Sequence, residues 1–111
     1  ANAVAARNKY NSLVGITNYN SELPSNFMLS QNYPNPFNPT TNIKFSIANP
    51  GLTSLKIYNT LGKEVASLVN QYLQAGSYDA DWNAGGFSSG VYFYRLQANG
   101  FVQTKRMLLI K

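Results

Sequence analysis

Residues 90–111, GVYFYRLQANGFVQTKRMLLIK, carry the clearest structural pattern in the chain. Two runs rich in aromatic and β-branched residues flank Asn99-Gly100, and this dipeptide is a strong signal for a two-residue hairpin turn. We therefore predict antiparallel strands at Gly90–Ala98 and Phe101–Lys111. The first of them is apolar or aromatic on both faces from Val91 to Leu96, which indicates a central strand rather than an edge strand.

Upstream of this hairpin the sequence alternates in the same way. In Asn42–Ala48, three apolar residues face one side and Lys44 and Ser46 face the other. Turn signals separate the runs, and we expect Gly62 to have a positive φ. The further predicted strands are Thr53–Tyr58, Lys63–Asn70 and Ser77–Asn83. The pattern predicts an all-β fold, a small immunoglobulin-like β-sandwich of about six to seven antiparallel strands; a small barrel is the alternative.

The region before these strands divides into two parts. Residues 27–41 contain three prolines, which exclude a helix and a central strand, so we expect an ordered, extended entry loop pinned by Tyr33 and Phe37. Residues 1–26 show no sustained period and are interpreted as a linker or the tail of a preceding passenger domain. A strand at Leu13–Thr17 is the alternative there. The folded domain is thus predicted to span residues 27–111.

Composition limits the chemistry that the chain can perform. The 111 residues suffice for one domain, and 44% of them are hydrophobic, which supports a real core. There is no cysteine and no histidine, so disulfides, thiolate metal sites and the commonest general base are excluded. Asp79 and Asp81 share one predicted strand face, without any sign of a cleft, and are interpreted as solvated. We expect no catalytic residue, no metal and no cofactor.

The net charge of +5 raises the question of a polyanionic partner. The lysines are spread singly over the predicted strands and cluster only near Lys105, so we expect no nucleic-acid binding. No run approaches the roughly 20 apolar residues of a membrane span. Tyr92 and Tyr94 share a face and could form a sugar-stacking platform, whereas Trp82 is assigned to the core. The alternative function is therefore a carbohydrate-binding or structural β-sandwich module appended to a secreted hydrolase.

The chain contains four motifs in order. YPNPFNPTT followed by IKF lies at residues 33–45, and LKIYN followed by LGKEV lies at 55–65. SSGVYFYRL lies at 88–96 and KRMLLIK at 105–111. Together these motifs resemble the type A C-terminal sorting domain of the type IX secretion system. The resemblance covers about residues 27–111 in order. It implies a non-catalytic secretion signal that directs a larger exported protein across the outer membrane.

The resemblance also implies partners, a route and site residues. The partners would be the outer-membrane translocon and shuttle proteins of the type IX system, with a cell-surface sortase as processing enzyme. The protein would pass through the periplasm and then be cell-surface-bound or secreted. The sorting-signal residues would be Pro34, Asn35, Pro36, Gly90, Val91, Tyr92, Lys105, Arg106, Met107, Leu108, Leu109, Ile110 and Lys111. The sortase would cut among Thr17, Asn18, Tyr19, Asn20, Ser21, Glu22, Leu23, Pro24, Ser25 and Asn26.

The last predicted strand gives a physical reason for a terminal signal. Leu108 and Ile110 lie on one face, and Met107 and Leu109 lie on the other. A strand that is apolar on both faces requires cover on both sides, and its edge could pair with another β protein. We therefore expect this strand to be displayed to a partner, with a dimer through the edge strand as a further possibility.

Overall fold

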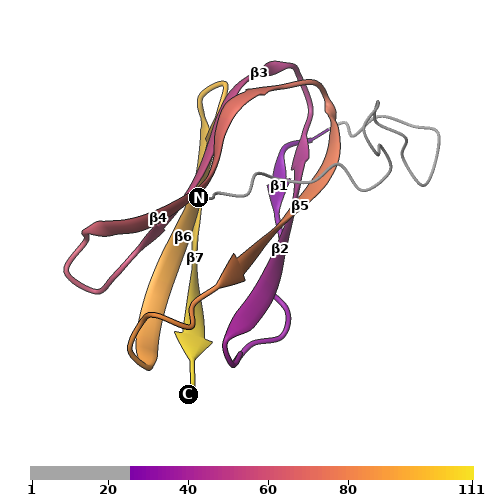
Figure 1. Cartoon of the computed structure of the whole chain (residues 1–111). Coiled ribbons are helices and arrows are strands. Elements are labelled where there is room, and N and C mark those ends of the chain that lie inside the picture. The colour runs from indigo at the N-terminus through magenta and orange to yellow at the C-terminus, as the bar shows by residue number, and fades with distance from the viewer. Residues whose placement is uncertain (1–25) are drawn as a thin grey trace.

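The computed structural model describes residues 26–111, which form seven antiparallel strands in two sheets (Figure 1). The smaller sheet has the order β1-β2-β5 and the larger has the order β4-β3-β6-β7. The bounds are β1 Met28–Leu29, β2 Thr40–Ile47, β3 Gly51–Tyr58, β4 Glu64–Leu73, β5 Gly76–Asn83, β6 Gly90–Ala98 and β7 Phe101–Leu109. The predicted all-β sandwich is confirmed.

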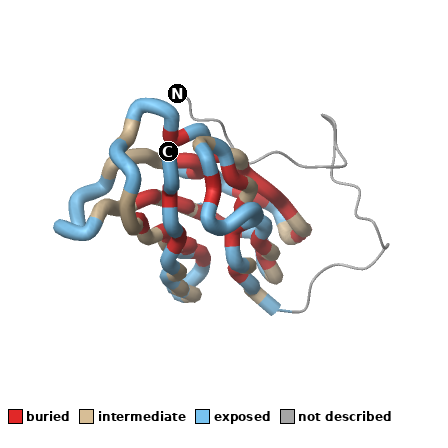
Figure 2. Tube along the Cα trace, turned by 90° about the horizontal axis from the view of Figure 1, so that it is seen from below, coloured by how far each residue is buried: buried red, intermediate tan, exposed pale blue. Residues whose placement is uncertain are grey.

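Alternation along the strands builds the core between the sheets. Ile43, Phe45 and Ile47 of β2 are buried, and the residues between them are more exposed. Leu55 and Ile57 of β3 face them from the other sheet and are also buried. Figure 2 shows buried and exposed positions alternating along the tube. Because the side-chain period of a strand is two residues, this register places one face of each sheet inside.

The topology is that of an immunoglobulin-like sandwich in which β4 belongs to the same sheet as β3, β6 and β7. The prediction that Gly90–Ala98 is a central strand is confirmed, since β6 pairs with β3 on one side and with β7 on the other. β7 therefore lies at the edge of its sheet. The β3–β4 pairing contains register shifts, whereas the β6–β7 pairing is regular over its whole length.

The turns follow the predicted chemistry. Asn99 and Gly100 both have positive φ, 50° and 84°, as a two-residue hairpin of this type requires. Gly62 has a φ of 81°, as expected. The Asn59 carboxamide oxygen accepts hydrogen bonds from the Leu61 and Lys63 amides and closes that turn.

Strand boundaries differ from the predictions at several places. Residues 27–41 were expected to be a loop throughout, but Met28–Leu29 pairs with β2 and forms β1. β4 continues to Leu73, and β7 ends at Leu109 rather than at the last residue. Tyr33 was expected to pin the loop to the core, and this prediction is wrong because its side chain is 80% exposed. Its backbone, rather than its ring, makes the contact, through two hydrogen bonds with Asn42.

The interpretation of Asp79 as a solvated surface residue is also wrong. Asp79 is buried, with 5% exposure, and Asp81 is partly buried. Asn42 on the paired strand β2 donates from its amide nitrogen to both carboxylates, at 2.9 Å and 2.7 Å. The Asn42 amide thus satisfies part of the hydrogen-bonding capacity of both carboxylates, which allows Asp79 to be buried. The alternation of residues along one strand does not reveal a hydrogen-bond partner on another strand.

Candidate recognition site at the last strand

The segment that joins β1 to β2 contains the three prolines and is called the proline-containing segment. Its residues 35–37 lie along the outer edge of β7. The Phe37 amide donates to the Leu108 carbonyl at 3.0 Å, and the Ile110 amide donates to the Phe37 carbonyl at 2.9 Å. The Leu108 amide donates to the Asn35 side-chain oxygen at 3.0 Å. These bonds form a parallel bridge, so residues 35–37 act as a short substitute strand on this edge. The last third of β7 is thus covered by the domain's own chain.

Two buried aromatic residues hold this segment in place. Phe37 is 2% exposed and its ring lies 5.8 Å from that of Trp82. Tyr94 of β6 is fully buried, and its hydroxyl donates to the Ser30 carbonyl at 2.7 Å. The same hydroxyl accepts from the Asn32 amide at 2.8 Å. Phe37 therefore pins the loop, as predicted, and Tyr94 supplies the second anchor in place of Tyr33.

A polar network inside the segment fixes the position of its backbone. The Asn32 side-chain amide donates to the Thr41 hydroxyl and to the Pro34 carbonyl. The Thr41 hydroxyl also donates to the Pro34 carbonyl, at 2.9 Å. Asn32 and Thr41 are both buried, so each of these bonds satisfies a group that water does not reach. Gln31 extends the network to β7 by donating from Nε2 to the Arg106 carbonyl at 2.8 Å.

Three of the four motifs, which are far apart in the sequence, meet at this edge. A shallow groove of about 320 Å³ lies between the proline-containing segment and β6–β7. Its lining is drawn from all three motifs and consists of Asn35, Pro36, Val91, Arg106, Met107 and Leu108. The other predicted sorting residues are not part of this lining; these are Pro34, Gly90, Tyr92, Lys105, Leu109, Ile110 and Lys111.

The final lysine is docked on the loop before β6. Its ammonium group donates to the Gly85 carbonyl at 2.7 Å and to the Phe87 carbonyl at 3.0 Å. Its backbone amide donates to the Ser89 hydroxyl. Lys111 therefore joins the segment after β7 to the loop before β6, and no pattern in the sequence indicated that partner.

The end of β7 is not displayed as a whole. Met107 and Leu109 are in the core, at 1% exposure or less, because they face the opposite sheet. Leu108 and Ile110 face outward and are 37% and 48% exposed. The expectation of a fully displayed strand is thus wrong for two of its four apolar side chains and for the edge that residues 35–37 cover.

The aromatic residues considered for sugar stacking are core residues. Tyr92 and Tyr94 are 7% and 0% exposed, and Tyr92 meets the Trp82 ring edge-on at 5.4 Å. Buried rings of this kind cannot stack on a surface polysaccharide. Trp82 is in the core, as predicted.

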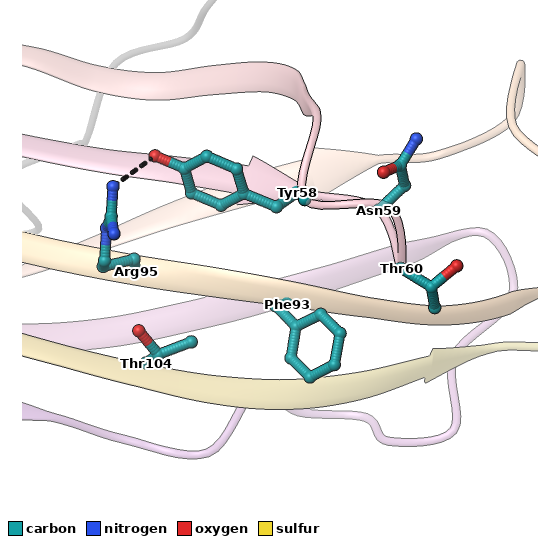
Figure 3. Close-up of a pocket in the computed structure, with 7 residues that line it drawn as sticks. Tyr58, Asn59, Thr60, Phe93, Arg95 and Thr104 are labelled. Atoms are coloured by element: carbon teal, nitrogen blue, oxygen red, sulfur yellow. Dashed lines mark hydrogen bonds between the residues drawn. The ribbon is translucent and has the colours of Figure 1, made fainter.

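A second shallow cavity, of about 330 Å³, lies on the outer face of the larger sheet (Figure 3). Arg95 lies over the Tyr58 ring at 5.0 Å and donates to its hydroxyl at 2.9 Å. Phe93 and Thr104 line the same cavity from β6 and β7. Sequence reasoning missed this pair of residues, although Tyr58 and Arg95 both fall on the outward face of predicted strands.

The fold and the site together define an all-β module with a surface groove assembled from terminal motifs. The chain belongs to the family of secretion system C-terminal sorting domains, whose model matches residues 31–111. The domain is therefore a sorting signal of type IX secretion, which directs export to the cell surface or the medium. Sorting-signal domains of this kind are non-catalytic in general.

No curated protein and no solved structure matches the chain. Among residues 26–111, no helix is long and apolar enough to cross a membrane.

Proposed function

We propose that the groove between the proline-containing segment and β7 is the surface that the type IX machinery recognises. The observation that carries this proposal is that three separate motifs line one groove. Asn35 and Arg106 contribute polar and charged groups to it, and Val91 contributes an apolar side chain. Arg106 and Leu108 are exposed there, so a partner reaches both a cation and an apolar side chain. The motif residues outside this lining, such as the buried Leu109, act by holding the groove in shape.

The partners in this proposal are the outer-membrane translocon and its shuttle proteins, and the route runs through the periplasm. We infer that the domain performs no catalysis itself, because its acidic residues are few and two of them share the Asn42 amide.

The test is a reporter secretion assay with point variants. Deletion of residues 105–111 would remove Met107 and Leu109 from the core and would unfold the domain, so it does not separate recognition from folding. Arg106→Glu and Leu108→Ser change exposed groove positions instead. Both variants are fused, as full chains, to an exported reporter in a host with the machinery.

We expect both variants to leave the reporter in the periplasm while the urea midpoint of the purified chain stays near that of the wild type. Leu61→Ser and Lys63→Glu, at the exposed turn between β3 and β4, are the matched controls and should be secreted normally. If the groove variants reach the cell surface as well as the controls do, the groove is not the recognition surface.

We further propose that residues 1–26 are the linker to a passenger domain and that the cell-surface sortase cuts among Thr17–Asn26. Thr17–Ser25 lie outside the described residues. Support comes from two boundaries, since the first described strand, β1, begins at Met28 and the family match begins at residue 31. Mass spectrometry of the mature passenger tests this proposal, and a passenger that ends downstream of residue 27 would contradict it.

A further inference from the structure

The outer edge of β7 is covered over only part of its length. The Leu108 amide and carbonyl both point away from β6, because they bond to Asn35 and Phe37. In an antiparallel pair, the residues that point their backbone groups away from the partner recur every second position. The β6–β7 register is unbroken from Phe101 to Leu109, so the backbone groups of Val102, Thr104 and Arg106 point outward too.

Residues 35–37 do not reach Val102 and Thr104. Among residues 26–111, the larger sheet ends at β7, and no strand lies beside its first half. Natural proteins usually protect such an edge with proline, a bulge or a very short strand. β7 has none of these three protections, since it has nine residues, no proline and a regular register. The protection that it does have is positive charge, from Lys105 and Arg106, which disfavours a basic strand but not an acidic one. This stretch is therefore a ready template for one more strand.

Charge around this open edge has one sign. The acidic residues of the described chain are Glu64 on β4 and Asp79 and Asp81 on β5. β4 is the edge strand at the far side of the larger sheet from β7, and β5 is the edge strand at the far side of the smaller sheet from β1. β6 and β7 contain no acidic residue but carry Arg95, Lys105 and Arg106. Figure 3 shows Thr104 on the strand next to Arg95, its cross-strand partner.

We propose that the edge of β7 from Val102 to Thr104, which ends before the Arg106 carbonyl that Gln31 already bonds, binds an acidic, extended peptide segment as an added strand. Main-chain hydrogen bonds to Val102 and Thr104 would supply the affinity, and the cations around them would select a partner rich in Asp or Glu. A second copy of the chain is a poorer occupant, because pairing two β7 edges brings Lys105 and Arg106 of each copy close to those of the other. This inference does not depend on the sorting role, because it is tested on the purified chain.

The probe is a fluorescent eight-residue peptide that alternates Thr and Glu, compared with peptides that alternate Thr with Gln or Lys. Anisotropy titration of the full 111-residue chain should show binding of the Glu peptide that weakens as salt is raised. The Gln peptide should bind at least about tenfold more weakly, and the Lys peptide should not bind. Hydrogen exchange should show the Val102 and Thr104 amides protected when the Glu peptide is present.

Thr104→Pro is the decisive variant, because it removes an outward amide without removing a bond to β6. We expect it to weaken binding of the Glu peptide about tenfold or more. Should Thr104→Pro fail to fold, Lys105→Gln combined with Arg106→Gln gives the second test, with Lys63→Gln as the matched charge control. The double variant should lose most of the binding and its salt dependence, whereas the control should lose neither.

Three results would overturn the proposal. The first is equal binding of the Glu and Gln peptides. The second is unchanged binding of the Glu peptide by a folded Thr104→Pro chain or by the double charge variant. The third is a dimer, formed without peptide and abolished by Thr104→Pro, which would show that the occupant is a second copy of the chain.

Discussion

The hydroxyl of Tyr94 is the most informative single group to remove. It lies in the core and bonds to two backbone groups of the proline-containing segment, the Ser30 carbonyl and the Asn32 amide. Tyr94→Phe keeps the ring and its packing and deletes both hydrogen bonds. The variant therefore measures how firmly the proline-containing segment is held on the larger sheet.

The expected loss follows from the burial of the two partners. Asn32 is 2% exposed, so its amide would remain buried without an acceptor, which costs about 1–3 kcal/mol. Ser30 is only partly buried, so water satisfies its carbonyl in part and the further loss is smaller. We expect Tyr94→Phe to lower the free energy of unfolding by about 2–3 kcal/mol. Small domains have about 5–15 kcal/mol in total, so this is a large fraction.

Urea denaturation followed by tryptophan fluorescence measures this loss, since Trp82 lies in the core. Two matched variants calibrate it. Tyr92→Phe removes a hydroxyl that donates to the exposed residue Ser88 and should cost at most about 1 kcal/mol. Tyr33→Phe changes an exposed ring and should cost less than about 0.5 kcal/mol. If Tyr94→Phe costs no more than Tyr33→Phe, the anchoring role of Tyr94 is refuted.

Three further predictions concern stability. Burial raises the pKa of Tyr94 to about 12. The stability that the protonated hydroxyl contributes is therefore complete below pH 10 and is lost as the pH rises towards and through 12. Urea midpoints measured against pH should decline over this range, and Tyr94→Phe should reduce the decline. Phe37→Ala should cost about 3–5 kcal/mol by urea denaturation, because the Phe37 ring is buried against Trp82. Gly51→Ala should cost about 1–2 kcal/mol by thermal unfolding, because its Cβ would lie 2.5 Å from the Asn99 side chain and displace it from two carbonyls.

Each of these predictions has a clear contrary result. A midpoint that falls equally above pH 10 in wild type and Tyr94→Phe would assign the decline to other groups. A Phe37→Ala chain that unfolds like the wild type would show that the segment does not belong to the cooperative unit. For Gly51→Ala, the double variant with Asn99→Ala should lose no further stability than Asn99→Ala alone, and an additive loss would contradict the contact.

The strands, the hairpin turns and the central place of β6 could all be predicted from the amino-acid sequence. These features depend on local rules: side chains alternate with a period of two, and Asn99-Gly100 accepts the positive φ values that the hairpin requires. The motifs also led to the family, because their order and spacing are properties of the chain.

The surface that those motifs form together could be seen only in the folded domain. The burial of Asp79 depends on Asn42 of another strand, and the anchoring of Ser30 and Asn32 depends on a hydroxyl more than sixty positions away. The cover on the end of β7, and the open edge at Thr104, likewise follow from where residues 35–37 happen to lie. Hydrogen bonds between distant segments have no period in the sequence, so their partners are fixed only when the sheets pack.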